Sequence, residues 1–312
     1  MKNALVPAVT VIIATYNSSR SLKLALESVL AQDFTDYEVW VVGDACTDNS
    51  QEVVRSFGDT RLQWTNLAYN SGSQAAPNNE GIRRARGEYI AYLGHDDLWF
   101  PWHLSGLLSF IRKTKADLVH PLSATLSPRG LEYTVGPPGA GRTYENHFVF
   151  PSSWLHHRRI IEDCGGWGDH LKLASGVDMD FLRRVYRAGK NILYYPSLSL
   201  LKFPSAYWRT YAPGTQPPQS GYIDRMKSDP QKLQHQILME AATWLAGPGD
   251  PRIPVRQAFR QFLRSLLHWI WMMDAYGHDR WPLARLKLWY VQRLNRIYRN
   301  KRGLPPLKPR DK

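Results

Sequence analysis

The chain has few cysteines and no long apolar run. Its 312 residues include only two cysteines, Cys46 and Cys164. They lie far apart and lack metal-ligand spacing, so the sequence suggests neither a disulfide framework nor a zinc site, and the reducing cytosol is the expected compartment. The N-terminal apolar run is broken by Pro7 and does not resemble a signal peptide. No segment approaches the roughly 18 apolar residues that a membrane-spanning helix needs.

The sequence also has almost no net charge outside its C-terminal region. The chain has 40 Lys and Arg against 27 Asp and Glu, a formal net charge of +13. Residues 251–312 contain 15 of the basic and 3 of the acidic residues, so the preceding body is nearly neutral. With 43% hydrophobic and 21% charged residues, the composition is globular and excludes a disordered chain. The body and the basic tail therefore need separate explanations.

In the first part of the chain, short apolar segments alternate with segments of helical periodicity. The pattern predicts strands near residues 9–14, 37–42, 62–65 and 89–93. It predicts helices near residues 21–32, 49–57 and 75–86. Repeated strand–helix units favour a parallel sheet with helices on both faces. In such sheets, ligands bind beyond the carboxyl ends of the strands.

Polar residues follow three of these predicted strands. They are Thr15, Tyr16 and Asn17 after the first, Gly43 and Asp44 after the second, and Gly94, His95, Asp96 and Asp97 after the fourth. Adjacent carboxylates at one sheet edge are costly unless a cation or hydrogen-bond donors compensate them, which favours a divalent metal. The alternative is that Asp96 and Asp97 cap a helix starting near Trp99 and Pro101.

Five motifs occur in order over residues 8–190. They are VTVIIATYNSS, VVGDACTDNS, NSGSQAAPNNEGIRRARGEYIAYLGHDD, CGGW and GVDMDFLRRVYRAG. In this order and spacing the chain resembles a family 2 glycosyltransferase. The resemblance implies an α/β GT-A fold, that of the nucleotide-diphospho-sugar transferases, which is a Rossmann-like mixed, mostly parallel sheet. A C-terminal helical extension would complete the chain.

The resemblance also implies a set of site residues. Those expected to bind the nucleotide sugar are Ala14, Thr15, Tyr16, Asn17, Asp44, Asn78, His95 and Asp96. Asp97 would coordinate Mg²⁺ or Mn²⁺ bridging the diphosphate, and Asp96 would contact the ribose or a metal-bound water. Asp178 takes the position of the general base that activates an acceptor hydroxyl. Trp167 and His156 are weaker candidates for the acceptor side, and a core position is the alternative for Trp167.

The function implied is transfer of one sugar, with inversion, from a nucleotide-diphosphate sugar to a glycan or lipid-linked acceptor. A UDP sugar is the favoured donor, and surface polysaccharide or glycoconjugate synthesis is the expected setting. No Gln-x-x-Arg-Trp signature of processive synthases follows the base segment. Gly43 and Gly94 stand where the family often has Asp, and Pro77-Asn78-Asn79 stands where Arg-Asn is common. These departures leave an alternative open, a non-catalytic nucleotide-sugar-binding module with a membrane-docking or oligomerising tail.

The expected domain organisation has three parts. A catalytic domain covers residues 1–211, with a nucleotide-binding half (1–120) and an acceptor half (121–211). Residues 212–250 form a linker and the start of a helical region, and residues 251–312 form a basic amphipathic helical tail with a disordered end. Asp180 is expected to be an N-terminal cap or a dipole partner of the helix that follows it.

The tail has three interpretations. Its helices can pack on the body or on a second subunit, giving a homo-oligomer. Alternatively, basic residues and interfacial aromatic rings over residues 256–302 favour an anionic membrane surface, which would place the protein peripherally on the inner face of the cytoplasmic membrane. Nucleic acid ranks last, because nothing in the tail resembles a nucleic-acid-binding module.

Overall fold

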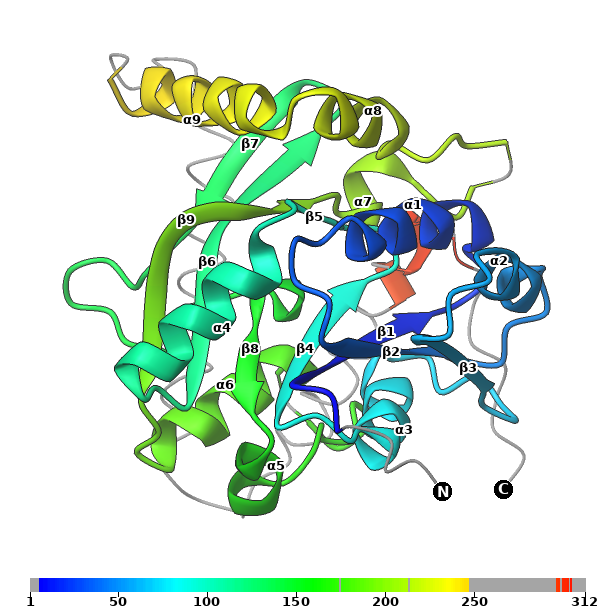
Figure 1. Ribbon diagram of the computed structural model, residues 1–312, viewed down its shortest axis with the longest axis horizontal. Coiled ribbons are helices and arrows are strands. Elements are labelled where there is room, and N and C mark those ends of the chain that lie inside the picture. Colours follow the sequence, from blue (N-terminus) through cyan, green and yellow to red (C-terminus); the bar gives the residue numbers. More distant parts are fainter. Residues whose placement is uncertain are drawn as a thin grey trace.

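A mixed β-sheet forms the centre of the molecule (Figure 1). The computed structural model describes residues 6–173, 175–212, 214–246, 296–297, 299–302 and 304. Within them, the strand order is β3-β2-β1-β4-β8-β6-β9-β5, with β7 paired to β6. The strands are β1 (Val9–Thr15), β2 (Tyr37–Gly43), β3 (Leu62–Asn66), β4 (Tyr89–Gly94), β5 (Leu98–Trp99), β6 (Leu118–Ser127), β7 (Gly130–Val135), β8 (Leu155–His157) and β9 (Ile192–Lys202).

Helices separate most of these strands. They are α1 (Ser19–Leu30), α2 (Ser50–Ser56), α3 (Ala75–Arg84), α4 (His103–Thr114), the 3-10 helix η1 (Pro151–Ser153), α5 (Arg159–Cys164), α6 (Val177–Arg187), α7 (Ser205–Trp208), α8 (Ser220–Ser228) and α9 (Pro230–Ala246). Strands β1 to β4 pair in parallel, as the strand–helix alternation predicts. One boundary differs from the prediction: a two-residue strand, β5, occupies the expected helix start, and α4 begins at His103.

Both faces of the sheet are buried, because side chains of β1 alternate between two apolar clusters. Val9, Val11 and Ile13 pack in a cluster with α1, α2 and α4. Ile12 packs in a second cluster with α3, α5 and α6 on the other face. This arrangement confirms the predicted three-layer α/β architecture.

The second part of the sheet is mixed. Strand β8 runs antiparallel to β4 and β6, whereas β6 and β9 are parallel. Helices α8 and α9 lie within the segment expected to contain a linker. Their apolar side chains, including Ile223, Met226, Leu233 and Ile237, are buried against β6 and β9. Residues 220–246 are therefore packed on the sheet, and the apolar periodicity of this short stretch was too weak for the sequence to predict that contact.

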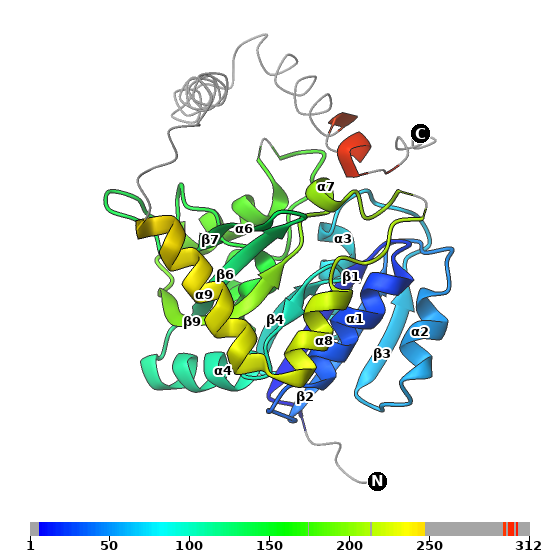
Figure 2. The ribbon, with the colours of Figure 1, turned by 90° about the horizontal axis from the view of Figure 1, so that it is seen from above.

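The strand register brings the predicted motifs to one edge. Thr15 pairs with Gly43, and Ala14 pairs with Gly94, so β1, β2 and β4 end side by side. The helical C-terminal residues 299–302 lie beside α7 at this edge (Figure 2). The other predictions for the tail, including most of the membrane-contact segment 256–302 and the disordered end, concern residues outside those described.

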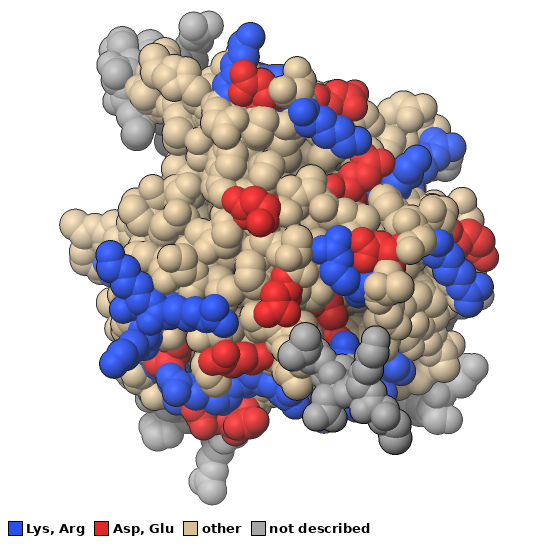
Figure 3. Space-filling view, in the orientation of Figure 1, with Lys and Arg blue, Asp and Glu red and all other residues tan. Residues whose placement is uncertain are grey.

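The surface of the body carries charges of both signs. On the face seen in Figure 3, basic and acidic side chains are interspersed, as the near-neutral composition of the body predicts. Of the helices in the described part of the chain, none combines the length and hydrophobicity that crossing a membrane requires.

Candidate functional site

A pocket of about 560 Å³ lies at the carboxyl edge of the parallel strands. Its walls come from the ends of β1, β2 and β4, from η1, from the start of α6, from the loop after β9 and from the C-terminal segment. Many residues predicted for the site line this one cavity, namely Ala14, Thr15, Tyr16, Asp44, Asn78, His95, Asp96 and Asp178. The topology therefore gathers residues that are up to 164 positions apart, from Ala14 to Asp178, as the motif order predicts.

Asp44 lines the pocket at the end of β2. Its Oδ1 accepts a hydrogen bond from the Ser71 amide at 2.8 Å, and its Oδ2 accepts one from the Gly72 amide at 3.1 Å. Burial raises the pKa of Asp44, while these amides favour its charged form. Nearby, the buried Thr15 Oγ1 has no hydrogen-bond partner among the described residues. A polar ligand in the pocket could supply one.

His95 is held as a neutral ring by two hydrogen bonds. Its Nδ1 lies 3.1 Å from the Ala14 carbonyl oxygen, which can only accept, so Nδ1 carries the proton. Nε2 therefore accepts from the Tyr211 hydroxyl, 3.0 Å away. Burial lowers the pKa of His95, in agreement with a neutral ring. His95 thus connects the end of β1 to the loop after β9.

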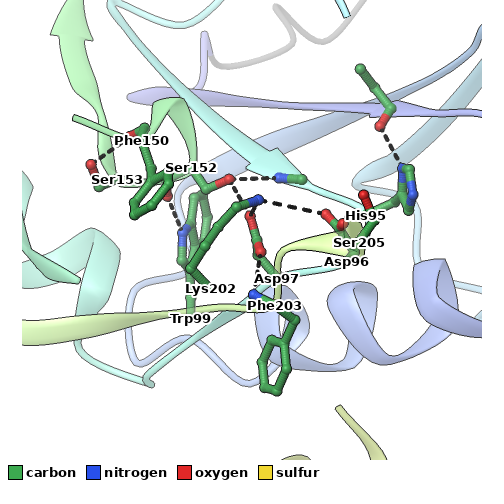
Figure 4. Close-up of polar contacts among 12 residues, drawn as sticks. His95, Asp96, Asp97, Trp99, Phe150, Ser152, Ser153, Lys202, Phe203 and Ser205 are labelled. Carbon is green, nitrogen blue, oxygen red and sulfur yellow. Dashed lines mark hydrogen bonds and ion pairs between the residues drawn. The ribbon is translucent and has the colours of Figure 1, made fainter. Parts of the chain in front are cut away.

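Asp97 lies beneath the pocket in a network of donors (Figure 4). Its Oδ2 accepts hydrogen bonds from Lys202 Nζ at 2.8 Å and from Ser152 Oγ at 2.5 Å. Its Oδ1 accepts one from the Phe203 amide at 3.1 Å. The Asp97 side chain is 0% exposed and does not line the pocket. Its carboxylate joins β4 to the end of β9.

The two acids expected to hold the metal, Asp97 and Asp96, lie in different surroundings. Both oxygens of Asp97 accept hydrogen bonds from internal donors. Asp96 instead lines the pocket, and its Oδ1 is 3.7 Å from Lys202 Nζ. Burial opposes ionisation of Asp96, but Lys202, His95 and Arg302 together lower its pKa. The alternative of a helix cap fails for both acids, because α4 begins only at His103.

The donor set for a divalent metal is small. Among the described residues no group of three or more His, Cys, Asp or Glu side chains converges on one point. Asp96 is a hard oxygen ligand facing the pocket, and Mg²⁺ is commonly held by one or two carboxylates together with substrate phosphates. The site therefore fits a metal that depends on the diphosphate for most of its ligands.

Packing explains the two glycines that depart from the family pattern. A Cβ at Gly94 would lie 2.7 Å from Asp97 Oδ2 and 3.0 Å from Asp96 Oδ1. A Cβ at Gly43 would lie 2.3 Å from Asn66 Oδ1. Neither position accepts a side chain unless its neighbours move. In this structure, neighbouring side chains occupy the space that an aspartate would need at either position.

Asp178 lies in the first turn of α6 and lines the pocket. Its Oδ1 accepts a hydrogen bond from the Met179 amide at 2.9 Å. Burial raises the pKa of Asp178 above its ordinary value of 3.8. Gly176 takes the N-cap position, and Asp180 lies in the first turn of α6, where an acid interacts favourably with the helix dipole. Asp180 also forms an ion pair with Arg184 at 2.9 Å.

Besides Asp97, three predicted site residues lie outside this pocket. The Asn17 side chain accepts a hydrogen bond from the Thr47 amide at 2.8 Å and so braces the loop after β2. Trp167 is 4% exposed and stacks on Phe181 at 5.2 Å, so it belongs to the core. His156 is fully buried in the middle of the sheet, where its Nε2 is 3.1 Å from the Tyr92 hydroxyl. Long-range packing, which the local motifs do not encode, decides these positions.

The pocket also contains charged and polar residues that the sequence analysis missed. They are Ser152, Lys202, Ser205, Tyr211, Arg299 and Arg302. These residues follow the recognisable motifs or lie between them. The only available signal was the basic character of residues 251–312, which indicated Arg299 and Arg302 as charged residues but not their position.

Comparison with known proteins finds a family match in the first part of the chain. Residues 10–157, just under half of the chain, match the family described as glycosyl transferase family 2. In Escherichia coli, the UDP-Glc:alpha-D-GlcNAc-diphosphoundecaprenol beta-1,3-glucosyltransferase WfgD is 29% identical over 112 residues. That match covers 36% of this chain and 44% of WfgD, so the chain shares less than half the length of this relative.

Solved glycosyltransferases have the same fold. TarS from Staphylococcus aureus in complex with UDP aligns over 76% of this chain and 71% of its own, with 21% identity and a TM-score of 0.54. The mannosyltransferase PcManGT from Pyrobaculum calidifontis, solved with GDP-Man and Mn²⁺, aligns over 95% and 88%, with 17% identity and a TM-score of 0.52. These similarities confirm the predicted GT-A fold.

We expect substitutions of the two adjacent acids to have different effects on stability. Asp97→Asn leaves Lys202 without its closest anionic partner, so the free energy of unfolding should fall by about 3–5 kcal/mol. Asp96→Asn, the matched control, should lower it by less than Asp97→Asn does, because the Asp96 carboxylate lies farther from Lys202. Urea denaturation of both variants measures the difference. Equal stability of the two variants would contradict the structural role of Asp97.

Proposed function

We propose that the protein is an inverting glycosyltransferase that moves one sugar from a nucleotide-diphosphate sugar to an acceptor hydroxyl. The observation that carries the proposal is the single pocket that Asp44, Asp96 and Asp178 line together at the strand edge of a family 2 domain. A UDP sugar is the favoured donor, a choice supported by the structural similarity to TarS in complex with UDP.

Asp178 is the proposed general base. The acceptor hydroxyl gives its proton to the Asp178 carboxylate while its oxygen forms a bond to the anomeric carbon. The bond from that carbon to the diphosphate oxygen breaks at the same time, and its electron pair leaves with the nucleoside diphosphate. A carboxylate whose pKa is raised by burial holds a proton more readily than an ordinary aspartate does.

Other residues orient the donor. Tyr16 and Asp44 line the nucleotide end of the pocket, and Asp96 lies toward Lys202 and Asp97. Asp96 is the proposed protein ligand of Mg²⁺ or Mn²⁺, which would offset the charge of the leaving diphosphate. PcManGT, which has the same fold, was solved with Mn²⁺.

Aromatic side chains favour a glycan or lipid-linked acceptor. Tyr133, Phe148, Phe150 and Tyr207 line the pocket. Rings of this kind offer apolar faces to a ligand, while the polar groups of the pocket fix its orientation. The name of WfgD specifies a diphosphoundecaprenol acceptor, and a similar lipid-linked acceptor would place this protein at the inner face of the cytoplasmic membrane.

Asp178→Asn should abolish transfer and leave UDP binding within about twofold of the wild type, because the amide cannot take the proton but keeps the size of the side chain. The assay measures release of UDP from a panel of UDP sugars with Mn²⁺, and isothermal titration calorimetry measures UDP binding. Full turnover by this variant would refute the base assignment. Binding of nucleotide by the wild type without any product would favour the non-catalytic module.

The pH dependence of the rate offers a second test of Asp178. The base acts in its ionised form, and burial raises its pKa above 3.8, so kcat/KM should fall with decreasing pH at a higher pH than an exposed aspartate would give. The profile is measured from about pH 4 to pH 8, with circular dichroism as the control for folding. A value of kcat/KM that stays unchanged down to about pH 4 would contradict the prediction.

The proposed membrane contact of the tail is tested with the full chain. Basic side chains near an anionic surface each contribute about 1 kcal/mol, and salt screens this attraction. The protein should float with vesicles containing phosphatidylglycerol and dissociate as the salt concentration rises. Vesicles of phosphatidylcholine alone are the control. Equal recovery with both lipids, or recovery with neither, would reject the contact.

A further inference from the structure

We propose that C-terminal residues 299–302 and 304 are part of the donor site and that Arg299 and Arg302 bind the diphosphate of the nucleotide sugar. The inference rests on the proposed function, since it assigns a role to two residues in the same pocket. Both arginines and Leu304 line the cavity, although they lie more than 95 residues beyond Lys202 in the sequence. A tail outside the family 2 domain would thus complete the site.

Arg302 is fixed against α7 and the residues that follow it. Its Nε donates to Ser205 Oγ at 2.6 Å, and its Nη2 donates to Tyr211 Oη at 3.2 Å. Its carbonyl oxygen accepts a hydrogen bond from the Tyr211 amide at 3.2 Å. The Tyr211 hydroxyl in turn donates to His95, the residue before Asp96. A chain of hydrogen bonds therefore links Arg302 to the strand end that carries Asp96.

Arg299 lies toward the nucleotide end of the same cavity. It is half-buried, and burial lowers its pKa, as does the nearby Arg302, while Tyr16 and Asp44 favour its charged form. Arg302, by contrast, is linked to the Asp96 end. One arginine therefore lies near the residues proposed to hold the nucleoside, and the other is linked to the strand end that carries Asp96, the proposed metal ligand. The diphosphate of a nucleotide sugar would extend from the first of these regions to the second.

The two arginines offset the negative charge of the carboxylates that line the pocket. Three carboxylates line the cavity, those of Asp44, Asp96 and Asp178. Three cations face them, and one of these, Lys202, already contacts both Asp97 and Asp96. The positive charges supplied by the tail offset the repulsion that a diphosphate would otherwise meet, and guanidinium groups suit phosphate oxygens because they can donate two parallel hydrogen bonds.

The test compares UDP binding to four full-length variants. Arg299→Gln and Arg302→Gln each remove one charge from the pocket. Arg296→Gln and Lys301→Gln remove the same charge from exposed positions on the same segment and are the matched controls. Calorimetry with UDP should show binding about tenfold weaker or worse for the first pair and within about twofold of the wild type for the controls. Uridine, which lacks the diphosphate, should bind all four variants as it binds the wild type.

Three results would overturn the proposal. An equal loss of UDP affinity in all four variants would show that the tail acts only through its net charge. Parallel losses of uridine and UDP binding would show that the arginines hold the pocket together without contacting phosphate. Displacement of UDP by geranyl diphosphate at equal concentration would assign the arginines to a lipid diphosphate. If wild-type protein fails to bind UDP, the proposed function fails first.

Discussion

The buried contact between Lys202 and Asp97 is the interaction on which the site depends. It joins the loop after β4 to the last residue of β9, and Ser152 of η1 and the Phe203 amide complete the coordination of the carboxylate. A buried ion pair is maintained only when such additional hydrogen bonds satisfy it. Because Asp96 directly precedes Asp97, the same network fixes the backbone that presents the Asp96 carboxylate to the pocket.

A second hydrogen-bond network connects the loop after β4 to two other walls of the pocket. The Tyr211 hydroxyl donates to His95, whose protonated Nδ1 donates to the Ala14 carbonyl at the end of β1. The Ala14 carbonyl oxygen can only accept a hydrogen bond, so the proton of the neutral His95 ring is on Nδ1. Nε2 is then the acceptor for the Tyr211 hydroxyl. The nucleotide loop after β1, the acidic loop after β4 and the segment after β9 are therefore held as one unit. Such rigidity is what an enzyme needs when charge develops on a leaving group.

Much of the fold could be predicted from the pattern of apolar residues. Strands buried on both faces appear as short apolar runs, and the helices show apolar residues at helical spacing. The residues directly after β1, β2 and β4 were predictable for a related reason, since parallel strands place their carboxyl ends at one edge. Lys202 was not, because it lies 105 residues from Asp97 and no local pattern marks its partner. Trp167 and His156 have the residue types of a site, yet the packing of α6 and β8 buries them.

The adjacent acids show where the limit of sequence reasoning lies. Asp96 and Asp97 have the same chemistry and differ by one position, so composition and spacing cannot distinguish them. The turn after β4 directs one carboxylate toward Lys202, Ser152 and Phe203 and the other toward the cavity. The side chain with the most internal donors is the one least available to a ligand. The roles of the pair are therefore determined by β9 and η1, elements that the motif itself does not contain.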